Sequence, residues 1–219
     1  MNKQQIHIFT GHYGSGKTEV SLNFAIKAAN RGEKVTIIDL DTVNPYFRTN
    51  DAKAILQEHG IDVIASEFAS TNLDMPTVPA EVLGVFDREG IIIFDVGGDD
   101  EGAYALGQYF SFFEKTGYKM HLVVNAKRPL CSTSEEIVEM ALDIQRASRL
   151  KFTDIFNNTN VAKATDETTL MSEIDEIQKA SKELGIEIAA HCGKENALKN
   201  IESNKAFEMN IYIKMPFEY

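Results

Sequence analysis

The sequence has few cysteines and no long hydrophobic run. Its two cysteines, Cys131 and Cys192, form no C-x-x-C pair, so neither a disulfide framework nor a zinc or iron–sulfur site has support in the sequence. No stretch approaches the roughly 18 apolar residues that a membrane span needs. Residues 1–5 lead straight into a strand pattern, which leaves no room for a signal peptide. We therefore expect a cytoplasmic protein without a membrane anchor.

Positive charge is also scarce. The 219 residues include 22 Lys and Arg against 33 Asp and Glu, which gives a formal net charge of -11. Non-specific nucleic-acid binding depends on Lys and Arg that neutralise phosphates, so this composition disfavours it. The sequence also has no repeat and no linker rich in Pro, Gly or Ser. We expect a single domain over residues 1–219.

Short apolar stretches alternate along the chain with longer amphipathic ones, as is typical of repeated βα units. Most of the short stretches are too apolar for a sheet with one wet face. We expect a three-layer α/β fold, with a mainly parallel sheet of about seven strands and helices on both faces. The predicted strands are Ile6–Thr10, Val35–Asp39, Val63–Ala65, Ile91–Asp95, Leu122–Asn125, Thr153–Asn157 and Ile186–Ala190.

Helix start and stop signals lie between these strands. Glycines end the predicted helices Lys17–Asn30, Asp51–His59 and Thr168–Leu184. A capping box at Ser132–Glu135 predicts the start of another helix, which ends near Leu150. Two interpretations stay open for residues 210–214, a short edge strand or a docked tail.

The loop after the first predicted strand, Gly11–Thr18, spells G-x-x-x-x-G-K-[ST] in the strand–loop–helix context that this phosphate-binding motif requires. Its glycines let backbone N–H groups surround phosphate oxygens, and the following helix directs its positive dipole end to the same place. Lys17 would reach the β and γ phosphates, and the Thr18 hydroxyl would bind Mg²⁺. The alternative is a glycine-rich turn without a ligand. The predicted nucleotide-binding residues here are His12, Tyr13, Gly14, Ser15, Gly16, Lys17 and Thr18.

Two later strands end in acidic residues. The second ends in Asp39-Leu40-Asp41, and carboxylates at this edge of a parallel sheet point into the ligand crevice. Asp41 is predicted to be catalytic, as Lys17 is, and to bind the metal, while Asp39 either assists it or caps a turn. The fourth ends in Asp95-Val96-Gly97-Gly98, where catalytic Asp95 would bind Mg²⁺ through water and Gly98 N–H would contact the γ-phosphate as a switch. A structural turn at the double glycine is the alternative.

These three motifs together resemble the CobQ/CobB/MinD/ParA branch of P-loop proteins, which belongs to the SIMIBI class. The resemblance implies that Asp41 positions the hydrolytic water, that Thr18 helps to hold Mg²⁺, and that Asp95 is the switch II acid. It also implies that Asn158 reads the nucleotide base, with Asn125 as a second candidate. Because residues 125–128 do not spell the N-K-x-D guanine motif, we predict ATP as the nucleotide.

The phosphate loop departs from this family at two positions. Many members carry Lys and then Gly where this chain has His12 and Tyr13, and that Lys reaches the partner's phosphates across a homodimer. His12 would donate to a phosphate and Tyr13 would cover the nucleotide. Alternatively, both would only form the side of the loop, without contacting the nucleotide. A homodimer stays among the expected assemblies, but one that lacks this lysine.

The leading hypothesis is a Mg²⁺-dependent ATPase that acts as a nucleotide-operated switch or delivery factor for a protein partner. Arg48 is a candidate charge stabiliser in a first switch at residues 44–49. The scaffold also serves ATP-dependent small-molecule enzymes similar to dethiobiotin synthetase and the cobyrinate amidases. In such an enzyme, polar groups for the acceptor would come from Asn44, Arg48, Lys127 and Arg128. A third hypothesis is a nucleotide-binding subunit that barely hydrolyses ATP.

Overall fold

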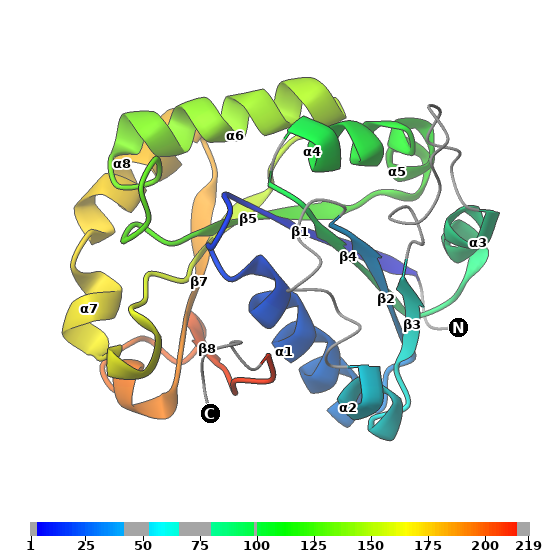
Figure 1. Ribbon diagram of the computed structural model, residues 1–219, viewed down its shortest axis with the longest axis horizontal. Helices are drawn as coiled ribbons and strands as arrows, with labels where there is room; N and C mark the ends of the chain where they lie inside the picture. The colour runs from blue at the N-terminus through cyan, green and yellow to red at the C-terminus, as the bar shows by residue number, and fades with distance from the viewer. Residues whose placement is uncertain (1–3, 42–52, 66–79, 99, 214–219) are drawn as a thin grey trace.

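The structure is a computed structural model that describes residues 4–41, 53–65, 80–98 and 100–213 (Figure 1). Within these residues a single sheet of eight strands has the spatial order β3-β2-β4-β1-β5-β6-β7-β8. Every pairing between the described strands is parallel. The predicted α/β fold is confirmed, and the sheet has one strand more than expected.

The central strands are buried on both faces, as their apolar composition predicts. All residues of β2 and β4 are buried, which requires a helical layer on each side. The unpredicted strand, β8, is short, half-exposed and pairs only with β7 among the described strands. The bounds are β1 Gln5–Thr10, β2 Val35–Leu40, β3 Asp62–Ala65, β4 Ile91–Val96, β5 Lys119–Val124, β6 Asp154–Asn157, β7 Glu187–Gly193 and β8 Ala206–Glu208.

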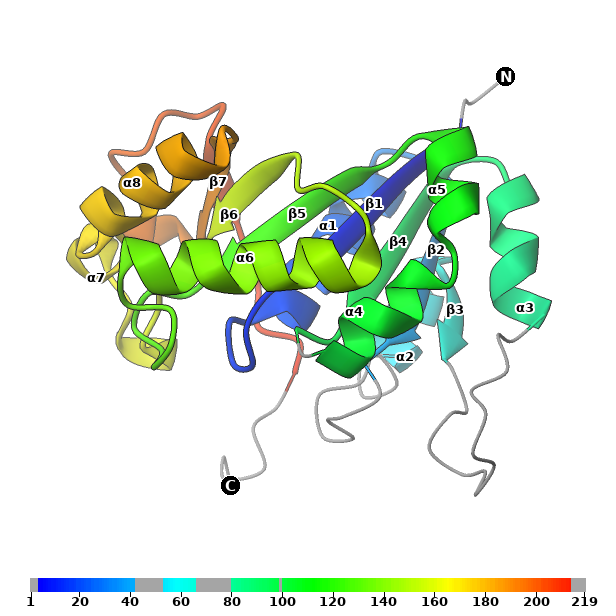
Figure 2. The same cartoon turned by 90° about the horizontal axis from the view of Figure 1, so that it is seen from above.

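Helices cover both faces of the sheet (Figures 1 and 2). One face packs against α1 (Lys17–Asn30, as predicted) and α2 (Lys53–Glu58), and the other against the remaining large helices, so each face has its own large hydrophobic core. No helix in the described part of the chain is long and apolar enough to cross a membrane. The other helices are α3 Ala80–Leu83, α4 Asp100–Gly107, α5 Phe110–Thr116, α6 Ser134–Ser148, α7 Glu167–Met171 and α8 Ile174–Leu184, with 3-10 turns at Gly84–Asp87, Ala162–Ala164 and Glu195–Ala197.

The predicted helix Thr168–Leu184 is wrong in its continuity, because the chain forms two helices there. Between α7 and α8 the Ser172 hydroxyl donates to the Thr169 carbonyl (2.9 Å), and the Glu173 carboxylate pairs with Lys127 Nζ (2.8 Å). Both contacts lie at the turn of residues 172–173. The prediction for 51–59 corresponds to α2, with residues 51–52 outside the described part of the chain.

The capping box of α6 lies one residue later than predicted. Thr133 Oγ1 accepts the Glu136 N–H (3.3 Å), and the Glu136 carboxylate accepts the Thr133 N–H (3.2 Å). The same carboxylate also accepts from the N–H and the hydroxyl of Ser132. These two extra bonds explain why the Thr133–Glu136 register replaces the predicted register that begins at Ser132.

The last described residues form a docked tail on α1. The Asn210 N–H donates to Asn23 Oδ1 (2.8 Å), and Asn23 Nδ2 donates to the Asn210 carbonyl (2.9 Å). The Glu19 carboxylate, in the first turn of α1, accepts the N–H groups of Tyr212 (2.6 Å) and Ile213 (3.2 Å). The docked-tail interpretation therefore holds for residues 210–213, and residue 214 lies outside the described part.

Three polar side chains form a buried chain across β1, β5 and β6. His7 Nδ1 lies 2.9 Å from His121 Nε2, and His121 Nδ1 lies 2.5 Å from Asp154 Oδ1. With Asp154 ionised, His121 Nδ1 donates to it, and His121 Nε2 accepts the Nδ1–H of His7. Burial lowers the pKa of His7 to about 3, with His121, Lys119 and Arg31 adding to the effect and Asp154 opposing it.

We expect His7→Asn to make the protein more tolerant of acid. The unfolded chain binds a proton at His7 below a pH of about 6.5, whereas the folded protein excludes it down to about 3, so the free energy of unfolding falls through this window as the pH drops. Asparagine keeps a donor near the position of Nδ1 but does not titrate. Urea unfolding near pH 7 and near pH 4.5 measures how much free energy of unfolding each protein loses between the two pH values. The loss in His7→Asn should be smaller than that of the wild type by about 1–3 kcal/mol.

The control is His59→Asn, which removes an exposed imidazole just after α2. This variant should keep the acid sensitivity of the wild type. Equal losses of stability in His7→Asn and the wild type would contradict the assignment of His7 as a neutral buried base.

Candidate functional site

The predicted site residues gather where β1, β2 and β4 end, on the face of the sheet that α1 covers. Asp39 of β2 and Asp95 of β4 are register partners, so their side chains lie next to each other. The loop Gly11–Thr18 joins β1, the other neighbour of β4, to the start of α1. The strand order therefore brings together acids that lie far apart in the sequence.

Glycines with left-handed backbone shape this phosphate loop. Gly14 has φ 76° and Gly16 has φ 83°. Gly16 is the N-cap residue of α1, and no side chain caps that helix, which leaves the first-turn N–H groups to an anion. A Cβ on Gly16 would stand 2.4 Å from Asn158 Nδ2. The left-handed backbone therefore favours glycine at position 16, and any side chain there would have to displace the Asn158 amide.

Asp95 is completely buried, and neither of its carboxylate oxygens has a hydrogen-bond partner among the described residues. Burial raises the pKa of Asp95 to about 8, with Asp39 and Asp41 adding to the effect and Lys17 opposing it. The Thr18 hydroxyl also favours the ionised form, but it is not placed to satisfy either oxygen. A divalent cation beside these oxygens would lower the pKa of Asp95, so the residues present fit Mg²⁺.

Lys17 and Asp41 form a buried ion pair. Lys17 Nζ lies 2.8 Å from Asp41 Oδ2, and both side chains are shielded from solvent. Each charge compensates the other, because an unpaired charge in the interior is costly. The Asp41 N–H donates to Asp39 Oδ1 (3.0 Å), so Asp39 does cap this turn. The pair places Asp41 beside the lysine of the phosphate loop.

Gly98, at the end of the D-x-x-G segment, packs directly on the phosphate loop. A Cβ at Gly98 would stand 1.7 Å from the Gly11 oxygen and 2.4 Å from the Gly11 carbonyl carbon. The Thr10 hydroxyl donates to the carbonyl of Gly97 (3.3 Å). The sequence did not predict this backbone contact, and the contact of the Gly98 N–H with a γ-phosphate stays a prediction.

His12 and Tyr13 form the outer part of the loop. His12 Nδ1 lies 2.9 Å from the Tyr13 carbonyl, and the Tyr13 side chain is 63% exposed. The histidine therefore binds its own loop, as expected if His12 and Tyr13 only form the side of the loop. Their roles toward a phosphate and a nucleotide stay predictions. Arg48 and the rest of residues 44–49 lie outside the described part of the chain.

The two asparagines predicted near the base stabilise loops. Asn158 is buried, and its Nδ2 donates to the Ser15 carbonyl (2.7 Å). Asn125 is fully buried and binds the N–H (3.2 Å) and the carbonyl (3.3 Å) of Asn160. Base reading by Asn158 stays a prediction. The buried Ser15 hydroxyl has no partner in the described part of the chain, which makes it a further polar group open to a ligand.

Arg128, predicted only as a polar group for an acceptor substrate, lies on the phosphate loop. Its Nε donates to the Gly14 carbonyl (3.1 Å). Because β5 neighbours β1, loops that follow the two strands meet at one edge of the sheet. Knowledge of the strand order would thus have identified Arg128 as a residue next to the phosphate loop.

Comparison with protein families finds that the family described as CobQ/CobB/MinD/ParA nucleotide binding domain matches residues 6–205. Comparison with curated proteins gives no match. Among solved structures, the cell division protein FtsY from Thermotoga maritima has a TM-score of 0.59 and 19% identity, over 86% of this chain and 61% of that one. The 54 kDa signal recognition particle protein from Aeropyrum pernix, in complex with GDP, has a TM-score of 0.57 and 20% identity, over 86% of this chain and 41% of that one.

A nucleotide-binding protein from Archaeoglobus fulgidus, in complex with ADP, has a TM-score of 0.51 and 15% identity, over 84% of this chain and 81% of that one. The chain spans only 59% and 61% of the length of two FtsY structures that it matches. At these identities the likeness to solved structures concerns the fold.

Proposed function

This chain belongs to the family of CobQ/CobB/MinD/ParA nucleotide-binding domains, and from this premise we propose that it is a Mg²⁺-dependent ATPase that acts as a nucleotide-operated switch for a protein partner. The observation that carries the proposal is the buried carboxylate of Asp95, unpartnered among the described residues and next to the phosphate loop. A buried acid without a partner suits a cation-dependent step on a phosphate.

In this proposal, four residues have defined tasks. Lys17 binds the β and γ phosphates. Its ammonium contacts Asp41 in the structure, so it must either contact Asp41 and phosphate together or leave Asp41 for phosphate. Asp41 then accepts a hydrogen bond from the attacking water and orients it toward the γ-phosphate. The Thr18 hydroxyl and, through water, Asp95 hold Mg²⁺, whose charge offsets that of the phosphates.

The switch in this proposal is the segment after β4. Loss of the contact between the Gly98 N–H and the γ-phosphate would let this segment move, and α4, which follows it and packs against α6, would move with it. A protein that binds this side of the molecule would sense the change. A second copy of the chain is one candidate partner, although His12 binds its own loop and would not replace a lysine that reaches across a dimer.

The acceptor-substrate alternative gains no specific support. Lys127 pairs with Glu173, and the Nε of Arg128 donates to Gly14 of the phosphate loop, so neither contact points to an acceptor substrate. Asn44 and Arg48 lie outside the described residues. We keep ATP as the proposed nucleotide, with Asn158 near the base. The test includes GTP, because solved structures similar in fold hold ADP or GDP.

We expect the wild type to bind ATP with Mg²⁺ and to hydrolyse it slowly. Lys17→Ala should weaken ATP binding by about 100-fold or more, because it removes the ammonium from the phosphate loop. Asp41→Asn should keep binding within a few fold but lower turnover by about 100-fold, because the water loses its orienting carboxylate. Isothermal titration calorimetry with ATP and GTP, together with a phosphate-release assay, measures these effects.

Lys27→Ala is the matched control, since it removes a lysine from the last turn of the same helix. Its binding and turnover should equal those of the wild type. Failure of the wild type to bind either nucleotide, or equal binding by Lys17→Ala, would contradict the proposed function.

A further inference from the structure

Arg128 contacts the tip of the phosphate loop from the loop that follows β5. Its Nε donates to the carbonyl of Gly14 (3.1 Å). Atoms of its side chain also lie 3.4–3.7 Å from the place where a Cβ on Gly14 would stand. The guanidinium therefore packs against the face of the loop that a glycine leaves open.

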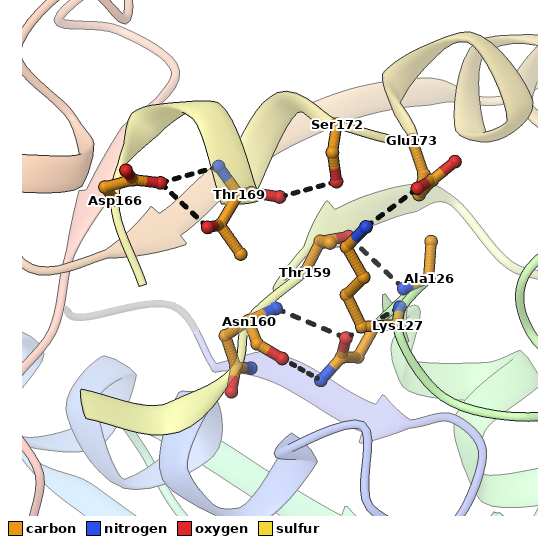
Figure 3. A network of polar contacts seen from close by, with 9 residues as sticks. Ala126, Lys127, Thr159, Asn160, Asp166, Thr169, Ser172 and Glu173 are labelled. Atoms are coloured by element: carbon orange, nitrogen blue, oxygen red, sulfur yellow. Dashed lines mark hydrogen bonds and ion pairs between the residues drawn. The ribbon is translucent and has the colours of Figure 1, made fainter. Parts of the chain in front are cut away.

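The two residues before Arg128 make one backbone contact and one side-chain contact with residues that follow β6 (Figure 3). The Ala126 N–H donates to Thr159 Oγ1 (3.2 Å), and Lys127 Nζ pairs with the Glu173 carboxylate (2.8 Å). Arg128 therefore reaches the phosphate loop from a loop that is itself anchored.

The charge of Arg128 has no carboxylate partner among the described residues. None of the ion pairs in this part of the chain includes it, and its side chain is exposed. Its one described side-chain hydrogen bond uses Nε, so the four N–H donors of the two terminal nitrogens have no described acceptor. The chain has more acids than bases, so a cation without an acidic partner beside the phosphate loop is informative.

We propose that Arg128 binds a phosphate oxygen of the nucleotide through its terminal N–H groups while Nε holds the tip of the loop at Gly14. This inference rests on the proposed function. A planar guanidinium suits phosphate because it donates several hydrogen bonds in a fixed geometry and keeps its charge. Arg128 would therefore supply a permanent positive charge to the phosphate loop from the β5 side.

We expect Arg128→Gln to weaken ATP binding by about tenfold to 100-fold, because a charge-assisted contact with phosphate is lost. It should also make binding less sensitive to salt, because one cation–phosphate contact fewer is screened. Arg128→Lys should recover part of the affinity and the full salt sensitivity, because lysine keeps the positive charge but lacks the planar guanidinium with its several donors. Calorimetry with Mg-ATP and Mg-ADP, at about 50 and 200 mM NaCl, measures these effects and shows whether the γ-phosphate is the group contacted.

The control is Arg146→Gln, which removes the same charge from the last turn of α6, where Arg146 pairs with Asp143. Its ATP affinity should stay within about twofold of the wild type. If the wild type binds ATP, Lys17→Ala does not, and Arg128→Gln binds as the wild type does, this inference is overturned while the proposed function stands.

A second result would also overturn this inference. In it, Arg128→Gln loses the same affinity at both salt concentrations, and Arg128→Lys loses as much as Arg128→Gln does. Arg128 would then only support the loop. Thermal unfolding without ligand checks that each variant is folded, which we expect because the Arg128 side chain is exposed.

Discussion

Asp95→Asn should be more stable than the wild type near pH 8 in the absence of nucleotide, and it should not hydrolyse ATP. The unfolded chain releases the Asp95 proton near pH 3.8, whereas the folded protein keeps it until about pH 8. The free energy of unfolding therefore falls as the pH rises through this window. Asparagine has nearly the same shape and no charge, so it removes this loss.

The gain near pH 8 should be about 2–4 kcal/mol, less than the full shift at about 1.4 kcal/mol per pKa unit because water and the protein relax around the charge. This corresponds to a midpoint increase of about 5–10 °C in thermal unfolding. Turnover should fall by about 100-fold or more, because a Mg²⁺-binding group is lost. Differential scanning calorimetry near pH 5 and pH 8, with a phosphate-release assay, measures both effects.

Asp143→Asn is the control, because it removes a half-buried carboxylate from α6. Its stability should change little, and equally at both pH values. A stability gain in Asp95→Asn that does not grow between pH 5 and pH 8 would show that Asp95 is not a buried acid with a raised pKa.

Gly98→Ala should disrupt the contact between the switch segment and the phosphate loop. The new methyl group would stand 1.7 Å from the Gly11 oxygen, and no side-chain rotation can relieve a clash with backbone. One of the two segments must move. We expect a loss of stability of about 2–3 kcal/mol or more, and at least a tenfold decrease in ATP turnover, because the site loses its geometry.

Gly84→Ala is the matched control, because nothing lies within 4 Å of the position that its Cβ would take. This variant should have the stability and turnover of the wild type. Thermal unfolding and phosphate release compare the two. Wild-type behaviour of Gly98→Ala would mean that the close packing of Gly98 on Gly11 is not a feature of the folded protein.

The parts of the fold that the sequence predicts well are those with local signals. The helix Lys17–Asn30 begins at the GKT motif and is followed by a glycine, and its predicted ends are correct. The β-branched runs at β2 and β4 identify strands buried on both faces. In these segments the local preference and the tertiary environment agree, so the pattern alone is sufficient.

The missed elements depend on contacts between distant segments. At the break between α7 and α8, Glu173 pairs with Lys127, a contact that the helix pattern does not contain. The capping box has two registers of similar quality, and the extra bonds of Glu136 with Ser132 select one. The short strand β8 has only three residues, too few for a periodic signal.

The candidate site shows the same division. The motifs identify Lys17, Asp41 and Asp95 by residue type and by position after a strand. The ion pair of Lys17 with Asp41, and the contact of Arg128 with Gly14, follow from the order of strands in the sheet. A single sequence does not contain that order, so the partners of these residues became known only from the structure.

The phosphate loop is attached to the rest of the protein at several points along its short length. Gly98 packs on Gly11, Arg128 binds Gly14, and Asn158 binds the residue after it. A segment held in this way has little conformational entropy left to lose, since ordering it was already part of folding. Preorganisation of this kind lets more of the interaction energy with a phosphate appear as affinity, because the ligand does not have to order its own binding site.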